Sequence, residues 1–128
     1  AFNAIMAAFK LPKDTPDQEA ARSAAVEAAT LHAAEVPAAV ARKAVAIMEL
    51  ALQAATLGNI NAISDAGTSL ALARAALTGA GLNVRTNVHS LQKPEAGAAL
   101  LQELVLLNNR ATEIEKAYQT VLQDRAGF

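Results

Sequence analysis

The sequence contains no cysteine and no tryptophan, and aromatic residues make up only 3% of its 128 residues. The lack of cysteine excludes disulfide bonds, thiol catalysis and cysteine metal sites together. The formal net charge of −1 argues against a nucleic-acid-binding surface. No apolar run reaches the length of a membrane span and no signal peptide is visible, so we expect no membrane partner and a cytoplasmic location.

What the sequence has in abundance is alanine, the residue with the highest helix propensity. No segment shows the alternation of β-branched or aromatic residues that is typical of a strand. We therefore predict an all-α fold, a bundle of long helices in one domain that covers residues 1–128. Residues 1–10 already have the pattern of a helix interior and no cap precedes them. We therefore expect the chain to be a fragment, the C-terminal portion of a longer helical domain.

Proline, glycine and capping residues predict three breaks between helices, near residues 11–15, 58–62 and 91–93. Thr15 and Gln18 form a capping box for a helix that extends to residue 56. Pro37 lies within this segment and removes a backbone donor, which predicts either one helix kinked at Pro37 or two helices that meet near residues 35–36. The apolar stripe expected beyond the proline consists of Val40, Ala44, Ile47, Ala51 and Ala54.

The last helix is predicted to begin at Pro94 and carries apolar residues at alternating spacings of four and three. These residues are Leu100, Leu104, Leu107, Ala111, Ile114, Tyr118 and Val121. Such a stripe indicates a helix that packs either against its own bundle or in a seam between two chains.

Polar side chains concentrate in residues 58–87, where one helix ends and the next begins. Ser64 is the expected cap of the second of these helices, and Asp65 lies in its first turn, where a negative charge is favoured. Asp65 and Asn83 are five helical turns apart, so they share a face but are separated by about 27 Å. The residues between them on this face are Ser69, Leu72, Ala76 and Gly79, of which only Leu72 is large.

This spacing leaves two interpretations open. The face between Asp65 and Asn83 is either a packing surface with polar ends, or the contact surface of a homodimer. An antiparallel pair of these helices would bring Asp65 next to the partner's Asn83. Asn83 and Asn87 would be costly to bury unpaired, so each should bond across an interface or bind a ligand.

The rest of the sequence offers few candidates for chemistry. His32 has no second metal ligand nearby, and His89 shares a helical face with Arg85, which suggests either an anion contact or a solvated helix end. No zinc, phosphate-loop or nucleophile-elbow motif is present, so no metal site is expected. Asp65 is the one acidic residue in an unusual setting, and its alternative role is to complement the helix dipole.

Three segments together resemble a known family. They are GNINAISDAG with LALARAALTGAGLNVRTN, EVPAAVARKA around Pro37, and the N-terminal AFNAIMAAFKLPKDTPDQEAARSAA. Their order and spacing are similar to the cyclodeaminase/cyclohydrolase family, which includes the C-terminal domain of formiminotransferase-cyclodeaminase and the methenyltetrahydrofolate cyclohydrolases. The resemblance implies an all-helical homodimer, a tetrahydrofolate derivative as substrate and no prosthetic group. The glycine-rich segment and the acidic residue that precede this region in the family have no counterpart here, and Thr86 replaces an expected aliphatic residue.

The resemblance also implies roles for individual residues. Asp65 is the expected catalytic residue, because cyclisation and ring opening both need a proton transfer that a carboxylate can supply. The expected substrate-binding residues are Asn59, Asn61, Ser64, Asn83, Arg85 and Asn87. Folate carries carboxylates on its tail, for which Arg85, Lys10 and Lys13 are candidate partners.

Three functions remain open from the sequence. The first is a folate enzyme, either a formiminotetrahydrofolate cyclodeaminase or a methenyltetrahydrofolate cyclohydrolase. The second is a relative without catalytic activity that binds a ligand through the same face. The third is a helical assembly module in which the polar groups of residues 58–87 serve only as caps and interhelix hydrogen bonds.

Overall fold

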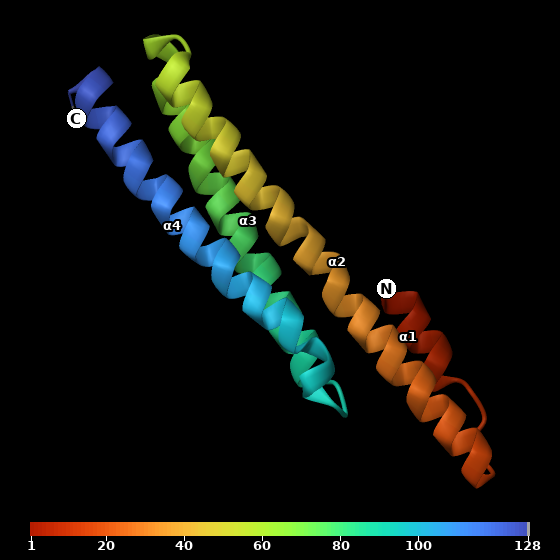
Figure 1. Cartoon of the computed structure of the whole chain (residues 1–128). Coiled ribbons are helices and arrows are strands. Elements are labelled where there is room, and N and C mark those ends of the chain that lie inside the picture. The colour runs from red at the N-terminus through yellow and green to blue at the C-terminus, as the bar shows by residue number, and fades with distance from the viewer. Residues whose placement is uncertain (128) are drawn as a thin grey trace.

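The structure, a computed structural model, describes residues 1–127 and is built from helices alone in that range (Figure 1). The four α-helices are α1 (Phe2–Phe9), α2 (Pro16–Leu57), α3 (Ile63–His89) and α4 (Ala98–Ala126). Two short 3-10 turns, η1 (Ile60–Ala62) and η2 (Pro94–Gly97), precede α3 and α4. The predicted all-α bundle is confirmed, and all three predicted breaks fall between helices.

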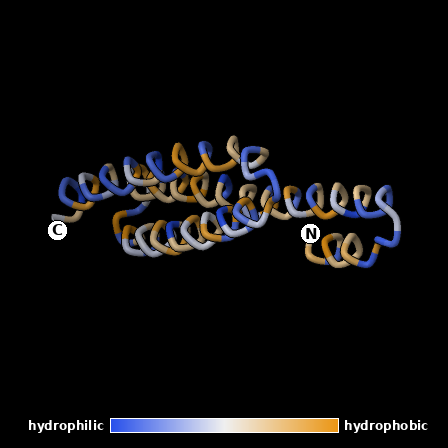
Figure 2. Tube along the Cα trace, turned by 90° about the horizontal axis from the view of Figure 1, so that it is seen from below, coloured by the Kyte–Doolittle hydropathy of each residue, from blue (hydrophilic) through white to orange (hydrophobic). Residues whose placement is uncertain are grey.

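Helices α2, α3 and α4 lie side by side, and each runs antiparallel to the one before it (Figure 1). The first turns of α2 extend past the ends of α3 and α4, and the short α1 lies beside this part of the helix (Figures 1 and 2). Because α2, α3 and α4 alternate in direction, the connection between α2 and α3 lies at the same end of the bundle as the C-terminal end of α4. No helix among residues 1–127 is long and apolar enough to cross a membrane.

Alanine shapes the core of this bundle. Helix α2 contributes mostly alanine to the core: Ala34, Ala38, Ala41, Ala44, Ala51 and Ala55 are buried. Small side chains allow two helix backbones to approach closely, and larger residues fill the remaining space. The largest of these fully buried side chains are Met48, Leu77, Leu104, Ile114 and Val84.

The structure confirms the apolar stripe predicted for α4 and contradicts part of the one predicted for α2. In α4, Leu104, Ala111, Ile114 and Tyr118 are buried and the other stripe residues pack partly buried against them, so this stripe packs within its own bundle. In α2 the predicted stripe is partly wrong, because Val40 and Ile47 are about half exposed. The true core stripe of α2 is turned toward Ala41, Val45 and Met48, since α3 and α4 both pack on that side.

Tyr118 fixes α4 against the start of α3. Its hydroxyl donates a hydrogen bond of 2.9 Å to the backbone carbonyl of Ile63, and the side chain is buried. Gly67 leaves the space for this hydroxyl, because a Cβ at Gly67 would overlap it and lie 3.0 Å from Tyr118 Cζ.

We expect Gly67→Ala to destabilise the protein, since relieving an overlap of this kind typically costs about 1–3 kcal/mol. Gly79→Ala is the matched control, because a Cβ at Gly79 would meet nothing within 4 Å. The control should be stabilising by up to about 1 kcal/mol, the difference in helix propensity between glycine and alanine. Urea unfolding of both variants measures this contrast, and equal effects would show that Tyr118 does not need the space at Gly67.

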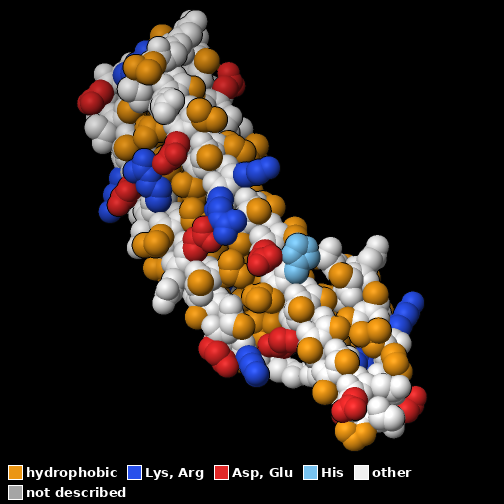
Figure 3. Space-filling view, turned by 45° about the vertical axis from the view of Figure 1, so that its right-hand side comes forward, with side chains coloured by type: hydrophobic (Ala, Val, Ile, Leu, Met, Phe, Trp, Pro, Cys, Tyr) orange, Lys and Arg blue, Asp and Glu red, His pale blue; other side chains and the backbone are white. Residues whose placement is uncertain are grey.

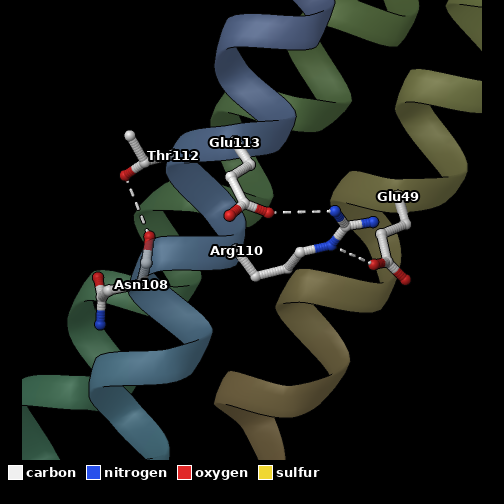
Figure 4. Close-up of polar contacts among 5 residues, drawn as sticks. All are labelled: Glu49, Asn108, Arg110, Thr112 and Glu113. Atoms are coloured by element: carbon white, nitrogen blue, oxygen red, sulfur yellow. Dashed lines mark hydrogen bonds and ion pairs between the residues drawn. The ribbon is translucent and has the colours of Figure 1, made fainter.

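Ion pairs join the exposed sides of α2 and α4. Oppositely charged side chains lie in adjacent groups on this face of the molecule (Figure 3). Arg42 binds Glu103 through two hydrogen bonds of 2.6 and 2.7 Å, and Arg110 contacts both Glu49 and Glu113 (Figure 4). The hydrogen bonds from Arg42 lower the pKa of the Glu103 carboxyl, so the pair's small contribution to stability is lost as the pH falls through that lowered pKa.

Candidate functional site

An open groove of about 420 Å³ lies between the last turns of α2 and the first turns of α3. Its lining residues are Ile47, Leu50, Ala51, Ala54, Gly58, Asn59, Ala62, Asp65, Ala66 and Ser69. The walls are mostly apolar, and the polar side chains come from the helix connection and from α3. Such a groove can hold a flat ring system against its apolar walls and present a carboxylate and an amide to that ring's polar atoms.

The connection between the helices determines where these polar groups lie. Gly58 follows α2, and the side-chain oxygen of Asn59 then accepts a hydrogen bond of 3.0 Å from the backbone nitrogen of Asn61. This bond caps η1, and α3 follows directly from Ala62 without a side-chain cap. The prediction that Ser64 caps α3 is therefore wrong, because the helix has already begun at Ile63.

Asp65 lies in the first turn of α3 as predicted, with an exposed side chain on the groove. Within residues 1–127 its carboxylate takes part in no side-chain hydrogen bond and no ion pair, although its backbone carbonyl accepts a bond of 2.9 Å from Ser69. The carboxylate therefore remains available to a ligand.

Arg125, near the end of α4, holds the α2 end of this groove in place. Its guanidinium donates hydrogen bonds to the backbone carbonyls of Ala55 and Gly58, the latter at 3.0 Å. These carbonyls belong to the end of α2, where no intrahelical donor is left for them. No local sequence pattern indicates this contact, because Arg125 is separated from Gly58 by 67 residues along the chain.

The other predicted site residues are placed apart from the groove. Asn61 and Ser64 are exposed but do not line it, and Asn83 is exposed toward the far end of α3. Arg85 lines a different groove of about 470 Å³, which it shares with His89 and residues of α4. The structure thus brings together Asp65 and Asn59, with Ser69 beside them, and leaves Asn61, Ser64, Asn83 and Arg85 outside.

Asn87 has a structural partner. Its side-chain amide donates a hydrogen bond of 3.0 Å to the backbone carbonyl of Ala33 in α2. In a regular helix that carbonyl would accept from residue 37, but Pro37 has no N–H to donate. Asn87 therefore supplies the bond that the proline removes, and α2 continues through Pro37 as one helix of 42 residues. The alternative of two helices meeting near residue 35 is wrong.

The candidate contacts for a carboxylate tail also lie elsewhere. Lys10 and Lys13 belong to the connection between α1 and α2, which is far from the groove along the length of α2 (Figure 1). Among residues 1–127, no group of three or more histidine or acidic side chains is placed to hold a metal ion.

Comparison with known proteins gives the family. Residues 1–105 match the sequence model of the family described as formiminotransferase-cyclodeaminase. The chain belongs to this family. The match covers α1, α2, α3 and the first turns of α4, and so includes every residue that lines the groove.

Alignment with an individual protein supports the same family. Over 122 residues the chain is 39% identical to a methenyltetrahydrofolate cyclohydrolase of Methylorubrum extorquens. The alignment covers 94% of this chain and 59% of that protein, so the chain spans about three fifths of the relative's length. The resemblance seen in the sequence is thereby confirmed.

Proposed function

We propose that this protein acts in folate one-carbon metabolism as a methenyltetrahydrofolate cyclohydrolase, with the groove beside Asp65 as the site of the reaction. The observation that carries the proposal is the Asp65 carboxylate, which has no side-chain partner within residues 1–127 and lies on a mostly apolar groove in a chain of the formiminotransferase-cyclodeaminase family. The named relative makes hydrolysis the first choice over deamination. A cytoplasmic location is part of the same proposal.

In the hydrolysis, water adds to the carbon that bridges N5 and N10 of the methenyl form. Asp65 takes a proton from the water as a general base, which generates a tetrahedral carbon. The hydroxyl on this carbon then loses its proton to solvent and forms the C=O bond as the bond from the carbon to N5 breaks. Asp65 returns its proton to N5, and 10-formyltetrahydrofolate results with the net release of one proton. The amide of Asn59 can donate hydrogen bonds to the ring system that the apolar walls hold.

Deamination in the same groove is the second candidate, because the family includes a cyclodeaminase. In that reaction N10 attacks the formimino carbon on N5, and the proton of N10 passes to the imino nitrogen. A further proton from Asp65 then allows the bond from the carbon to this nitrogen to break, so that ammonia leaves and the methenyl cation remains. A helical module that binds a ligand or a partner without turnover is the remaining alternative.

Ultraviolet spectroscopy with 5,10-methenyltetrahydrofolate tests this proposal. Purified protein should accelerate the loss of the methenyl absorbance above the rate in buffer. Release of ammonia from 5-formiminotetrahydrofolate, without methenyl hydrolysis, would instead favour the deaminase. If the protein showed neither activity and bound no folate, folate chemistry would be rejected and the assembly module would remain.

We further propose that the protein is a homodimer that uses the outer face of α3 between Asp65 and Asn83. Leu72 on this face is 68% exposed, and a Cβ at Gly79 would meet no atom within 4 Å, so the bundle itself leaves the face uncovered. Small residues allow a partner helix to approach closely. Antiparallel pairing would place Asp65 near the partner's Asn83 and cover part of each groove.

Replacing Ser69 and Ala76 together by leucine should separate the paired helices and shift the protein toward the monomer. Leucine in place of Ala71 and Thr78 is the matched control, because these residues are also exposed, also seven positions apart, and lie on another side of α3. Light scattering at micromolar concentration gives the masses. A monomeric parent protein would show that there is no dimer interface. A dimer that persists after leucine replaces Ser69 and Ala76 would place the interface elsewhere.

A further inference from the structure

One exposed side of α2 carries apolar residues at alternating spacings of four and three. This outer stripe consists of Val36, Val40, Lys43, Ile47, Leu50 and Ala54. Its four large apolar members are between 47% and 63% exposed, so the stripe is not part of the bundle core. Lys43 is the only charged residue in it, which sets this position apart from its neighbours.

The outer stripe leads directly into the groove beside Asp65. Ile47, Leu50 and Ala54 line that groove, and Lys43 lies one helical turn before Ile47, about 6 Å along the axis. Because α2 and α3 are antiparallel, Lys43, fourteen residues before the end of α2, is level with Leu77, fourteen residues after the start of α3. The surface therefore continues from the groove along α2 to an exposed ammonium group.

Small residues keep this route open on the α3 side. Ala76 and Gly79 lie at the level of Lys43, and both are exposed. A Cβ at Gly79 would still meet nothing within 4 Å. Within one chain, an extended molecule whose rings occupy the groove could therefore follow the outer stripe without displacing a side chain of α3. The partner helix of the proposed dimer would pack on the same small residues, so the molecule would then run between that helix and the outer stripe.

Among the described residues, Lys43 has no carboxylate partner, unlike the arginines nearest to it along α2 and α4. Arg42 and Arg110 are both bound to glutamates on the side of the bundle where α2 meets α4. Lys43 forms no ion pair within residues 1–127, and no acidic residue lies three or four positions away from it in α2. The groove lining contains an acid but no cation. At the helix connection the guanidinium of Arg125 is bound to the backbone carbonyls of Ala55 and Gly58. An anionic group that follows the outer stripe in the other direction would find its first positive charge at Lys43.

We propose that Lys43 binds the carboxylate tail of the folate substrate, while the ring system lies in the groove beside Asp65. This inference rests on the proposed function, because it takes the ligand to be a folate. It assigns the tail a direction along α2, away from the helix connection. It also replaces Arg85, Lys10 and Lys13 as the tail contact, because none of them borders this route.

Steady-state kinetics with two substrates tests the assignment. One substrate is 5,10-methenyltetrahydrofolate, and the other is the methenyltetrahydropteroate that lacks the glutamate. Lys43→Gln should raise KM for the first substrate about three- to tenfold, the range for loss of one solvent-exposed hydrogen bond, and leave kcat unchanged. KM for the tail-free substrate should stay the same, and Lys43→Arg should restore most of the affinity.

Lys116→Gln is the control, because it removes an exposed lysine of α4 that does not line the groove and should change neither KM. Equal increases of KM for both substrates after Lys43→Gln, or no increase for either, would overturn the tail assignment and leave the proposed function intact. Absence of turnover by the parent protein with both substrates would instead reject the proposed function, and the assignment with it.

Discussion

Asp65→Asn is expected to lower kcat about 10²–10⁴-fold, the range for loss of a general acid or base. The substitution keeps the size of the side chain and removes only its ability to exchange a proton. Within residues 1–127 the carboxylate has no side-chain partner, so no ion pair is lost with it. The effect on folding should be limited to the interaction with the helix dipole, about 0.3–1 kcal/mol.

Asp17→Asn provides the matched control for this effect. Asp17 lies in the first turn of α2 and is exposed, as Asp65 is in α3, but it is remote from the groove. Its loss should change stability by a similar amount and leave kcat unchanged. Turnover and urea unfolding measured on the same preparations separate the two roles. If Asp65→Asn retained full activity, or cost several kcal/mol of stability, Asp65 would have a structural role.

Asn87→Ala is expected to cost about 1–3 kcal/mol, because the carbonyl of Ala33 would be left without a donor in a partly buried position. The cost should depend on Pro37. In a Pro37→Ala background the N–H of residue 37 can bond to the Ala33 carbonyl, as in any regular helix. Removing Asn87 should then be less costly than in the parent protein.

A double-mutant cycle of these two substitutions, followed by urea unfolding, measures the coupling directly. We expect a coupling free energy of about 0.5–2 kcal/mol, since the two residues act on one carbonyl. Asn83→Ala, one turn earlier on α3 and exposed, should stay within about 0.5 kcal/mol in either background. An equal cost of Asn87→Ala with and without Pro37 would show that the proline is tolerated for another reason.

The sequence was informative where local chemistry decides structure. Helix breaks follow from proline, glycine and capping residues such as Thr15, whose hydroxyl accepts a bond of 3.3 Å from the backbone of Gln18. The position of Asp65 in a first turn followed from the same reasoning. The cap at Ser64 failed because a single turn of 3-10 helix, capped by Asn59, moved the start of α3 by two residues.

Contacts between distant segments could not be predicted in this way. In α2 nearly every helical face carries alanine, so periodicity alone did not tell the buried face from the exposed one. The pairing of Asn87 with the carbonyl freed by Pro37, and of Arg125 with the end of α2, each joins residues more than fifty positions apart. A single sequence also gives no basis for choosing which of the predicted substrate-binding residues face one ligand. Ser64, Asn83, Arg85 and Asn87 lie on a helix 27 residues long that presents them on several sides.

Backbone amide chemical shifts recorded during titration with the stable folate 5-formyltetrahydrofolate give the most direct test of the central claim, that the groove between α2 and α3 beside Asp65 binds the substrate. We expect the largest shifts at residues 58–69 and 47–54, which form the two walls of this groove. Shifts confined to the groove of Arg85 and His89, or no shifts at saturating folate, would contradict the claim.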